Sequence, residues 1–275
     1  MISAYGVIMP QIIYGTAWKQ ERTAALVEQA ISLGFRGIDT GCQPKHYHEA
    51  GVGAGIAVCL NKGLERSELY LQTKFTSLNG QDPLRIPYDA KASLAEQVAQ
   101  SFQASLKNLQ TPYLDCLVLH SPMPNPQQTL AVWQAMTDIF HSGAARQLGI
   151  SNCYKLQDLE ALYHASEIKP AVLQNRFYAD SQYDRGIRDF CRQHGIAYQS
   201  FWTLSANPHI LADTLLQTLA KQYQRNAAQV LFRYLTQIGI VPLTGTASAK
   251  HMAEDLAIFE FELTGDECAA LGALL

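Results

Sequence analysis

Short apolar runs alternate along the chain with longer segments in which apolar residues recur every three or four positions. This longer period predicts amphipathic helices, and it is clearest in residues 21–34 and 91–110. A third such segment, residues 226–239, begins with the potential helix cap Asn226 and ends at Gly239. The pattern therefore predicts helices separated by short strands.

The short runs are apolar on both faces, as strands are when both sides of a sheet are covered. There are eight of them, at residues 11–16, 35–40, 68–74, 114–120, 145–151, 170–175, 196–202 and 239–244. Eight strand-plus-helix units in 275 residues average about 34 residues each, the size of a β–α unit. We therefore expect an α/β fold, a closed (β/α)8 TIM barrel formed by residues 1–275 as a single domain.

An open, doubly wound parallel sheet is the alternative arrangement of the same elements. That fold usually carries a Gly-x-Gly-x-x-Gly phosphate-binding turn directly after a strand. The nearest match, GVGAGI at residues 51–56, follows a loop rather than a strand. The barrel is therefore the favoured interpretation.

Composition narrows the range of partners. With 48% hydrophobic residues, 16% charged residues and a net charge of −3, the chain resembles an ordinary globular protein. No cluster of lysine and arginine with interleaved aromatic residues points to nucleic acid, and no apolar run approaches the roughly 20 residues needed to cross a bilayer. We expect a monomer that acts on a small molecule and binds neither nucleic acid nor a membrane.

Six cysteines occur singly, without a C-x-x-C pair, so we expect reduced thiols and no bound metal. Residues 1–16 lack a charged leader and a small-residue cleavage site, so we expect no export signal. Together these features predict a cytoplasmic protein.

Ionisable side chains end three successive predicted strands. They are Asp39, Lys74 and His120, and active sites of such barrels lie at the carboxyl ends of the strands. A purely structural ion pair between Asp39 and Lys74 is one explanation, with Tyr47 as a packing aromatic. A catalytic explanation is that a lysine held by a carboxylate favours the phenolate form of Tyr47, so that this phenol acts as an acid near neutral pH.

Several segments, in order, resemble the aldo-keto reductase family over nearly the whole chain. They read GFRGIDT, LYLQTK, YLDCLVLHSP, QLGISN, KPAVLQN and AAQVLFRYLTQIGIVPLTGT. The resemblance implies a catalytic tetrad of Asp39, Tyr47, Lys74 and His120. It also implies reversible hydride transfer between a nicotinamide and the carbonyl carbon of a small substrate, with Tyr47 protonating the developing alkoxide.

The resemblance further implies which residues bind the cofactor and the substrate. Ser151, Asn152 and Gln174 would hold the nicotinamide amide, and Phe201 or its neighbour Trp202 would stack on the ring. The full implied cofactor set is Thr16, Ser151, Asn152, Gln174, Phe201, Trp202, Thr203, Leu204, Leu243, Thr244, Gly245, Thr246, Lys250 and Asp255. The implied substrate-binding residues are Trp18, His46 and Trp202.

The segment expected to bind the cofactor phosphate departs from the family pattern. Members that prefer NADP carry a lysine after the proline of the last strand, then an arginine and an asparagine. Here Leu243 takes the lysine position, and Lys250 or His251 takes the arginine position. Asp255, in the asparagine position, would repel a phosphate that Lys250 would attract. We expect NADP(H), with NAD(H) as the alternative.

The position of the acid also departs from the pattern. Family members usually place the tyrosine five residues after the aspartate, and that position is Pro44 here. Tyr47 comes eight residues after Asp39, and we interpret QPK as a loop insertion that delivers its ring to the active site. In the rival alignment His46 occupies the acid position, or the site is impaired.

Two other functions fit the same residues. Lys74 at the end of a barrel strand is suited to a Schiff-base lyase, with Asp39 and His120 moving protons. The chain is also consistent with a barrel that binds a nicotinamide nucleotide without turnover. The nicotinamide-like segments GISN and VLQN favour the reductase over the lyase.

An insertion at residues 76–93 follows Lys74. It is suited to an ordered loop over the active site, from which Arg85 and Tyr88 would reach a ligand. The alternative is that it packs against the outside of the barrel.

Overall fold

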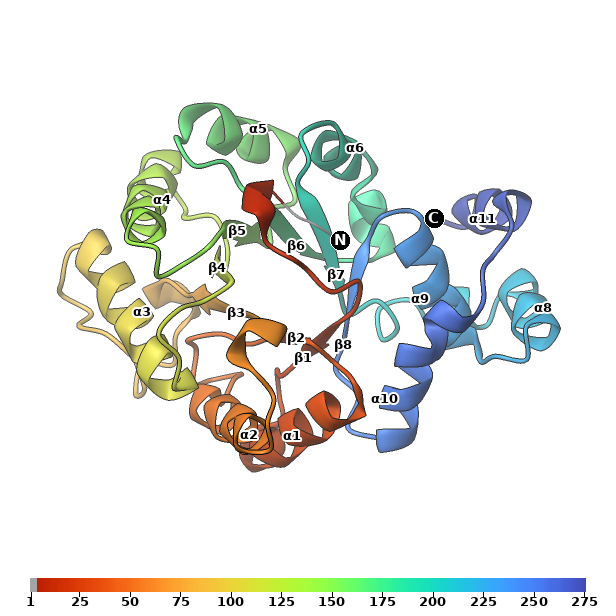
Figure 1. The fold of residues 1–275 in the computed structure, drawn as a ribbon. Helices are drawn as coiled ribbons and strands as arrows, with labels where there is room; N and C mark the ends of the chain where they lie inside the picture. The colour runs from red at the N-terminus through yellow and green to blue at the C-terminus, as the bar shows by residue number, and fades with distance from the viewer. Residues whose placement is uncertain (1–3) are drawn as a thin grey trace.

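The computed structural model describes residues 4–275 and shows a closed parallel barrel (Figure 1). Its strands are β1 Ile13–Gly15, β2 Gly37–Asp39, β3 Tyr70–Phe75, β4 Cys116–Leu119, β5 Leu148–Ser151, β6 Val172–Arg176, β7 Ala197–Phe201 and β8 Val241–Thr244. Each strand pairs in parallel with the next, and β8 closes the barrel against β1, with Thr244 opposite Tyr14. All eight predicted strands are present, which confirms the (β/α)8 barrel.

The helices surround the strands (Figure 1). They are α1 Thr23–Leu33, α2 Glu49–Asn61, α3 Leu94–Leu109, α4 Pro126–His141, α5 Leu156–Ala165, α6 Arg185–Gln193, α7 Pro208–Leu211, α8 Thr214–Gln222, α9 Ala227–Gln237, α10 Ala249–Leu256 and α11 Gly265–Gly272. The three helices predicted from periodicity correspond to α1, α3 and α9. Asn226 caps α9 as predicted, because its side chain accepts a hydrogen bond from the backbone N–H of Gln229. A 3-10 helix, η1 (Ala4–Gly6), precedes β1.

The barrel interior contains both apolar and polar side chains. The apolar ones include Met9, Ile13, Cys116, Val118, Val172 and Val241, all buried. Gln72, Gln174 and Gln199 are also buried, and Gln72 and Gln174 each hydrogen-bond to Gln199. The interior is therefore polar beside Asp39, to which Gln72 and Gln174 donate and where the sequence predicts chemistry.

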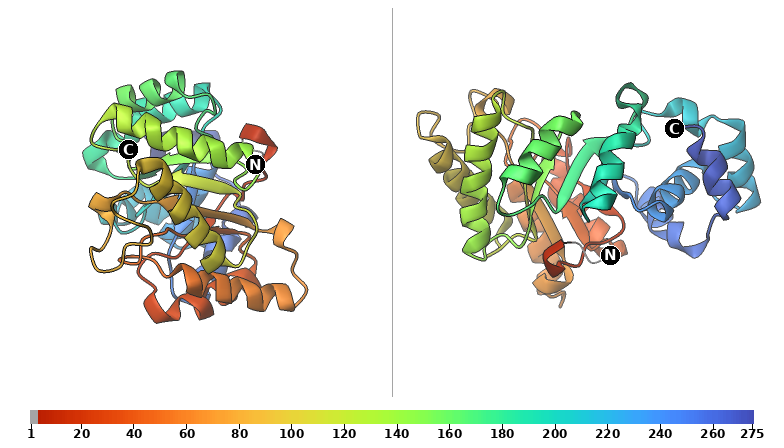
Figure 2. Two further views of the ribbon diagram at one scale, coloured as in Figure 1. Left: turned by 90° about the vertical axis from the view of Figure 1, so that its left-hand side faces the viewer. Right: turned by 90° about the horizontal axis from the view of Figure 1, so that it is seen from above.

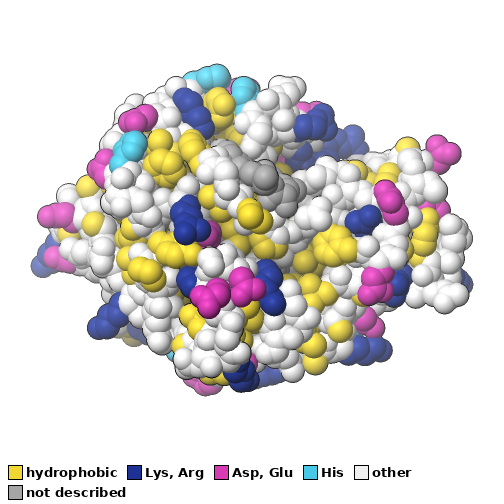
Figure 3. Space-filling model, viewed as in Figure 1, with side chains coloured by type: hydrophobic (Ala, Val, Ile, Leu, Met, Phe, Trp, Pro, Cys, Tyr) yellow, Lys and Arg dark blue, Asp and Glu magenta, His cyan; other side chains and the backbone are white. Residues whose placement is uncertain are grey.

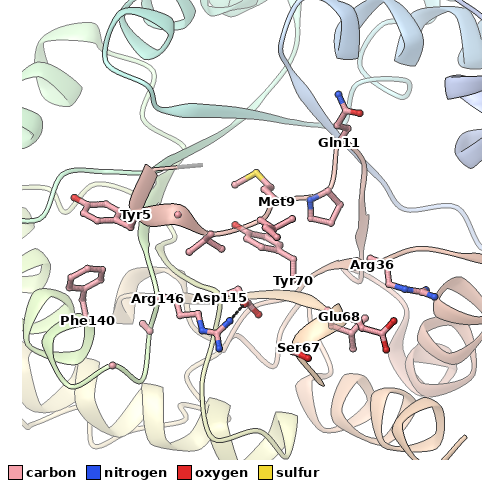
Figure 4. Close-up of a pocket in the computed structure, with 17 residues that line it drawn as sticks. Tyr5, Met9, Gln11, Arg36, Ser67, Glu68, Tyr70, Asp115, Phe140 and Arg146 are labelled. Atoms are coloured by element: carbon pink, nitrogen blue, oxygen red, sulfur yellow. Dashed lines mark hydrogen bonds and ion pairs between the residues drawn. The ribbon is translucent and has the colours of Figure 1, made fainter. Parts of the chain in front are cut away.

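Residues 5–11 lie at the other end of the barrel (Figure 1). Tyr5 in η1 accepts a hydrogen bond from the backbone N–H of Lys169 and donates one to its carbonyl. Beside this segment lies a cavity of about 860 Å³, lined in part by Tyr70 and by the ion pair between Arg146 and Asp115 (Figure 4). Tyr70 opens β3 and Asp115 precedes β4, so this cavity lies at the amino ends of the strands.

Two features concern the outer shape and surface. Helices α8 and α11 gather at one side of the barrel (Figure 2). The face seen in Figure 3 mixes acidic and basic side chains without a large area of one charge. Within residues 4–275, no helix has both the length and the apolar character needed to span a membrane.

Candidate active site

Asp39 and Lys74 form a buried ion pair at the carboxyl ends of β2 and β3. Lys74 Nζ lies 2.6 and 2.7 Å from the two carboxylate oxygens and donates to the carbonyl of Thr40 at 2.8 Å. Burial lowers the pKa of Lys74, but the neighbouring Asp39 carboxylate and Tyr47 phenol raise this pKa by more. The lysine is therefore a cation at neutral pH, and it is held by three acceptors.

Tyr47 lies over this ion pair, in the connection between β2 and α2. Its ring centroid is 5.1 Å from Lys74 Nζ. Burial raises the pKa of Tyr47, Lys74 lowers it by its charge and a hydrogen bond, and Asp39 raises it. The effect of Lys74 expected from the sequence is present, but burial outweighs it. The phenol is therefore protonated at neutral pH, the form that a proton donor requires.

His120, directly after β4, faces Tyr47. The two ring centroids are 6.0 Å apart, and the planes meet at 64°. Nδ1 of His120 lies 2.6 Å from the hydroxyl oxygen of Thr76. Burial, together with the positive charges of Lys74 and His46, lowers the pKa of His120 to about 3. The imidazole is neutral, and when Thr76 donates to Nδ1 the proton lies on Nε2, which can donate to a ligand.

A layer of buried glutamines holds the Asp39 carboxylate in place. Gln72 and Gln174 donate to Asp39 Oδ1 at 2.6 and 3.0 Å. The side-chain oxygen of Gln199 accepts from Gln72 at 2.8 Å and from Gln174 at 2.9 Å. Sequence reasoning missed Gln72 and Gln199. The available signal was their spacing of two residues from inward-facing positions such as Lys74.

A cavity of about 1160 Å³ opens above these residues at the carboxyl ends of the strands. The predicted site residues that line it are Trp18, Asp39, His46, Tyr47, His120, Ser151, Asn152, Gln174, Phe201, Trp202, Thr203, Leu204, Leu243, Thr244, Gly245, Thr246, Lys250 and Asp255. Thr16 and Lys74 do not line it. Thr16 is fully buried and donates its hydroxyl to the Asp39 carbonyl at 2.9 Å, so its side chain is turned to β2 instead of the cavity.

Three amide-binding candidates lie together on the wall of this cavity. Ser151 donates its hydroxyl to the Gln174 carbonyl at 2.6 Å. Asn152, whose backbone is left-handed with φ 54°, donates its amide to the His120 carbonyl at 2.8 Å and accepts a hydrogen bond from Tyr154 at 3.2 Å. The side-chain amides of Asn152 and Gln174 offer both donors and acceptors, which a carboxamide ligand needs. The cavity is larger than the roughly 300–1,000 Å³ of typical small-molecule sites, so it has room for a dinucleotide. The volume and the amide groups together fit a nicotinamide dinucleotide.

The rival acid, His46, packs on Trp18 at the rim. Their ring centroids are 4.1 Å apart, and the Trp18 backbone N–H donates to the His46 carbonyl at 2.7 Å. Burial and the nearby Lys45 lower the pKa of His46. The ring that packs against Lys74 is that of Tyr47, so the geometry favours Tyr47 as the acid.

Two cations of the cavity wall were not predicted. Lys19 donates to the Gly245 carbonyl and thereby connects the loops after β1 and β8. Arg176, two residues after Gln174, places its guanidinium 4.2 Å from the centroid of the Trp202 ring. The signal in both cases was spacing, since Lys19 follows Trp18 directly and Arg176 shares a strand face with Gln174.

The insertion at residues 76–93 does not reach the cavity. Tyr88 is buried and donates its hydroxyl to the Thr76 carbonyl at 2.8 Å. Arg85 forms an ion pair with Asp82 at 2.8 Å. Neither residue lines the cavity, so packing beside the barrel is the correct interpretation.

Comparison with known proteins agrees with this geometry. The sequence profile of the Aldo/keto reductase family matches residues 9–207. The chain belongs to the aldo/keto reductase family. The matched range contains β1 to β7 and therefore the four residues expected to form the tetrad, Asp39, Tyr47, Lys74 and His120. The segment expected to bind the cofactor phosphate, in β8 and α10, lies beyond it.

Relatives of this aldo/keto reductase match nearly its whole length. The glyoxal reductase of Bacillus subtilis is 29% identical over 248 residues, which cover 90% of this chain and 82% of the relative. An aldo/keto reductase of Brucella melitensis superposes with a TM-score of 0.86 at 26% identity, covering 100% of this chain and 98% of the other. A Bombyx mori aldo-keto reductase solved in complex with NADP superposes with a TM-score of 0.84 at 26% identity, covering 99% and 91%.

Proposed function

We propose that this aldo/keto reductase uses NAD(P)H to reduce small aldehydes or ketones to alcohols, with Tyr47 as the proton donor. The observation that carries the proposal is a protonated phenol over a buried ammonium, beside a neutral imidazole, at the end of a large cavity. The names of the relatives, which include a glyoxal reductase, agree with carbonyl reduction.

Each residue of the tetrad has a separate task in this reaction. A bound reduced nicotinamide supplies the hydride. Tyr47 donates its proton to the carbonyl oxygen, and the Lys74 ammonium stabilises the phenolate that remains. Asp39 keeps Lys74 charged and in position, and Nε2 of His120 holds the carbonyl oxygen by a neutral hydrogen bond.

The cofactor is proposed to lie along the wall from Ser151 to Asp255. Ser151, Asn152 and Gln174 would hold the carboxamide, and Phe201 would cover one face of the ring. Lys250 would attract a 2′-phosphate, which favours NADP(H) over NAD(H). The Bombyx mori relative binds NADP, in agreement with this choice.

A carbonyl panel tests the proposal. The purified protein is mixed with NADPH and with aliphatic, aromatic and sugar aldehydes, and loss of NADPH absorbance is followed. We expect steady oxidation with at least one class, and transfer of deuterium from deuterated NADPH to the alcohol carbon. If NADPH quenches tryptophan fluorescence but no aldehyde is reduced, the chain is the non-catalytic binding protein instead.

The geometry argues against the Schiff-base alternative. A nucleophilic lysine must be neutral and accessible, whereas Lys74 is 1% exposed and its pKa is raised by the neighbouring Asp39 and Tyr47 despite its burial. We expect borohydride to trap no adduct between Lys74 and a carbonyl compound, as judged by the mass of the intact protein.

A further inference from the structure

Arg176 ends β6 and lines the active-site cavity. It follows Gln174 by two residues, and side chains two apart on a strand lie on the same face. Gln174 points into the barrel, where it donates to Asp39, so Arg176 occupies the next layer toward the opening. Across the sheet it is paired with Phe201, the residue expected to cover the nicotinamide ring.

The guanidinium of Arg176 has aromatic neighbours and no anionic one. Its Cζ lies 4.2 Å from the Trp202 ring centroid and 5.1 Å from that of Tyr178. Its Nε is buried without a hydrogen-bond partner, and no acidic side chain among residues 4–275 forms an ion pair with it. Its contacts within residues 4–275 therefore leave its charge uncompensated.

The other cations of the cavity wall already have partners. Lys19 donates to the Gly245 carbonyl, and Lys250 lies 3.7 Å from Glu254. Other arginines also have a buried Nε without a partner, namely Arg188, Arg225 and Arg233, but they do not line the cavity. Only Arg176, within the described residues, combines an unpaired guanidinium with a place on the cavity wall.

A guanidinium in this state is suited to an oxyanion. It has five N–H donors and no acceptor, and leaving such donors unpaired in a partly buried place is unfavourable. Aromatic rings stabilise its faces through cation–π contacts but leave the N–H edge free. That edge matches the two oxygens of a carboxylate or a phosphate, which it binds by two parallel hydrogen bonds.

We propose that Arg176 binds an oxyanion of a ligand in the active-site cavity. The inference rests on the proposed function, because the oxyanion has two sources in that reaction. It belongs either to a carboxylate on the carbonyl substrate, which gives the enzyme a preference for aldehydo or keto acids, or to the diphosphate of the dinucleotide.

Two variants separate charge from shape. Arg176→Met removes the charge and keeps an apolar side chain beside Trp202. Arg176→Lys keeps the charge but lacks the two parallel N–H donors of the guanidinium. Arg192→Met is the matched control, because Arg192 is exposed and pairs with Asp189 away from the cavity. For each protein, kcat/KM is measured with succinic semialdehyde and with the uncharged butanal. Dissociation constants for NADPH, succinate and inorganic diphosphate are measured by tryptophan fluorescence.

The two sources give different results. If the substrate supplies the oxyanion, Arg176→Met lowers kcat/KM for succinic semialdehyde by about 10- to 100-fold, weakens succinate binding similarly, and leaves butanal and NADPH within about twofold. If the cofactor supplies the oxyanion, Arg176→Met weakens the binding of NADPH and of diphosphate by about 10- to 100-fold. The values of kcat/KM for the two aldehydes then fall by the same factor. Arg176→Lys gives a smaller loss in either case.

The proposal is overturned if all these quantities in Arg176→Met stay within about twofold of the parent, or if Arg192→Met loses as much. Should the parent reduce no aldehyde at all, the proposed function fails by itself. Binding of succinate and diphosphate to Arg176→Met then still decides the role of Arg176, because neither measurement needs turnover.

Discussion

The identity of the proton donor depends on which ring meets Lys74. The ring centroid of Tyr47 lies 5.1 Å from Lys74 Nζ, whereas His46 packs on Trp18 with centroids 4.1 Å apart. Spacing in the sequence left both residues open. The structure favours Tyr47, because the connection after β2 turns its ring toward Lys74 and leaves His46 packed on Trp18 at the rim.

Replacing Tyr47 by Phe removes the hydroxyl and keeps the ring. We expect kcat for aldehyde reduction to fall by about 10²- to 10⁴-fold, the usual contribution of a positioned acid, with the dissociation constant for NADPH changed less than about twofold. The matched control is His46→Phe, for which we expect less than a tenfold change. If steady-state kinetics show a larger loss of kcat for His46→Phe than for Tyr47→Phe, His46 is the acid.

At the scale of elements, the connection between β2 and α2 positions Tyr47 by close packing on Gly41. A Cβ at Gly41 would lie 3.1 Å from two ring carbons of Tyr47, closer than ordinary contact. Glycine is therefore needed here to make room for a neighbouring ring.

Gly41→Ala tests this contact. The added methyl displaces the phenol by a few tenths of an ångström, and we expect kcat to fall by about tenfold because proton transfer depends on position. The unfolding midpoint and the NADPH dissociation constant should change little. Gly265→Ala is the control, since nothing lies within 4 Å of a Cβ there. Equal kcat in the two variants would show that the ring tolerates the displacement.

A buried carboxyl group links β8 and α10. Asp255 is buried in the cavity wall and accepts a hydrogen bond from the Thr244 hydroxyl at 2.7 Å. Burial raises the pKa of Asp255 to about 6. Above that pH it is an anion that opposes the 2′-phosphate of NADP(H). We expect Asp255→Asn to strengthen NADPH binding relative to NADH by about tenfold at pH 7.5.

The pH dependence follows from the same group. As pH falls through about 6, Asp255 becomes neutral, so the parent should gain preference for NADPH. The 2′-phosphate itself titrates near this pH, and Asp255→Asn shares that effect, so the difference between the two proteins isolates the carboxyl. The same carboxyl also affects stability. Because its pKa is higher in the folded state than in the unfolded state, it adds to the free energy of unfolding at low pH, and this contribution is lost as pH rises through about 6. Parallel pH profiles of the two proteins would contradict the assignment.

Elements were more predictable than the connections between them. Burial imposes a pattern on the sequence itself, a continuous apolar run in strands such as β4 and a period of three to four residues in helices such as α3. The conformation of a connection depends on contacts with distant residues. Trp18 and Trp202 have φ values of 64° and 57°, which local preference does not predict for tryptophan. The insertion at residues 76–93 was undecided for the same reason.

At the scale of the whole molecule, the site and the barrel interior share one hydrogen-bond network. Asp39 of β2 accepts from Lys74 and Gln72, both in β3, and from Gln174 in β6. Gln199 of β7 accepts from both glutamines. The sequence indicated Asp39 and Lys74 by their type and position at strand ends. It did not reveal the glutamines, because barrel closure and strand register decide which polar residues meet.

Breaking the ion pair should therefore cost stability as well as activity. Lys74→Met leaves the Asp39 carboxylate buried and unpaired, and we expect a loss of about 3–5 kcal/mol in the free energy of unfolding. In the double variant Lys74→Met with Asp39→Asn, neither side chain is charged, and the amide oxygen at position 39 can still accept from Gln72 or Gln174. Most of the lost stability should return, while reduction stays absent because Tyr47 has no ammonium beside it.

Denaturant unfolding, followed by fluorescence and circular dichroism together, measures both effects. We propose that the chain is one domain, because β8 pairs with β1 and neither half of the barrel closes alone. The two signals should then change in a single transition in every variant. A double variant no more stable than Lys74→Met would show that Lys74 stabilises the barrel by more than its charge. Recovery of stability without activity would separate the structural role of the pair from its proposed role beside the phenol.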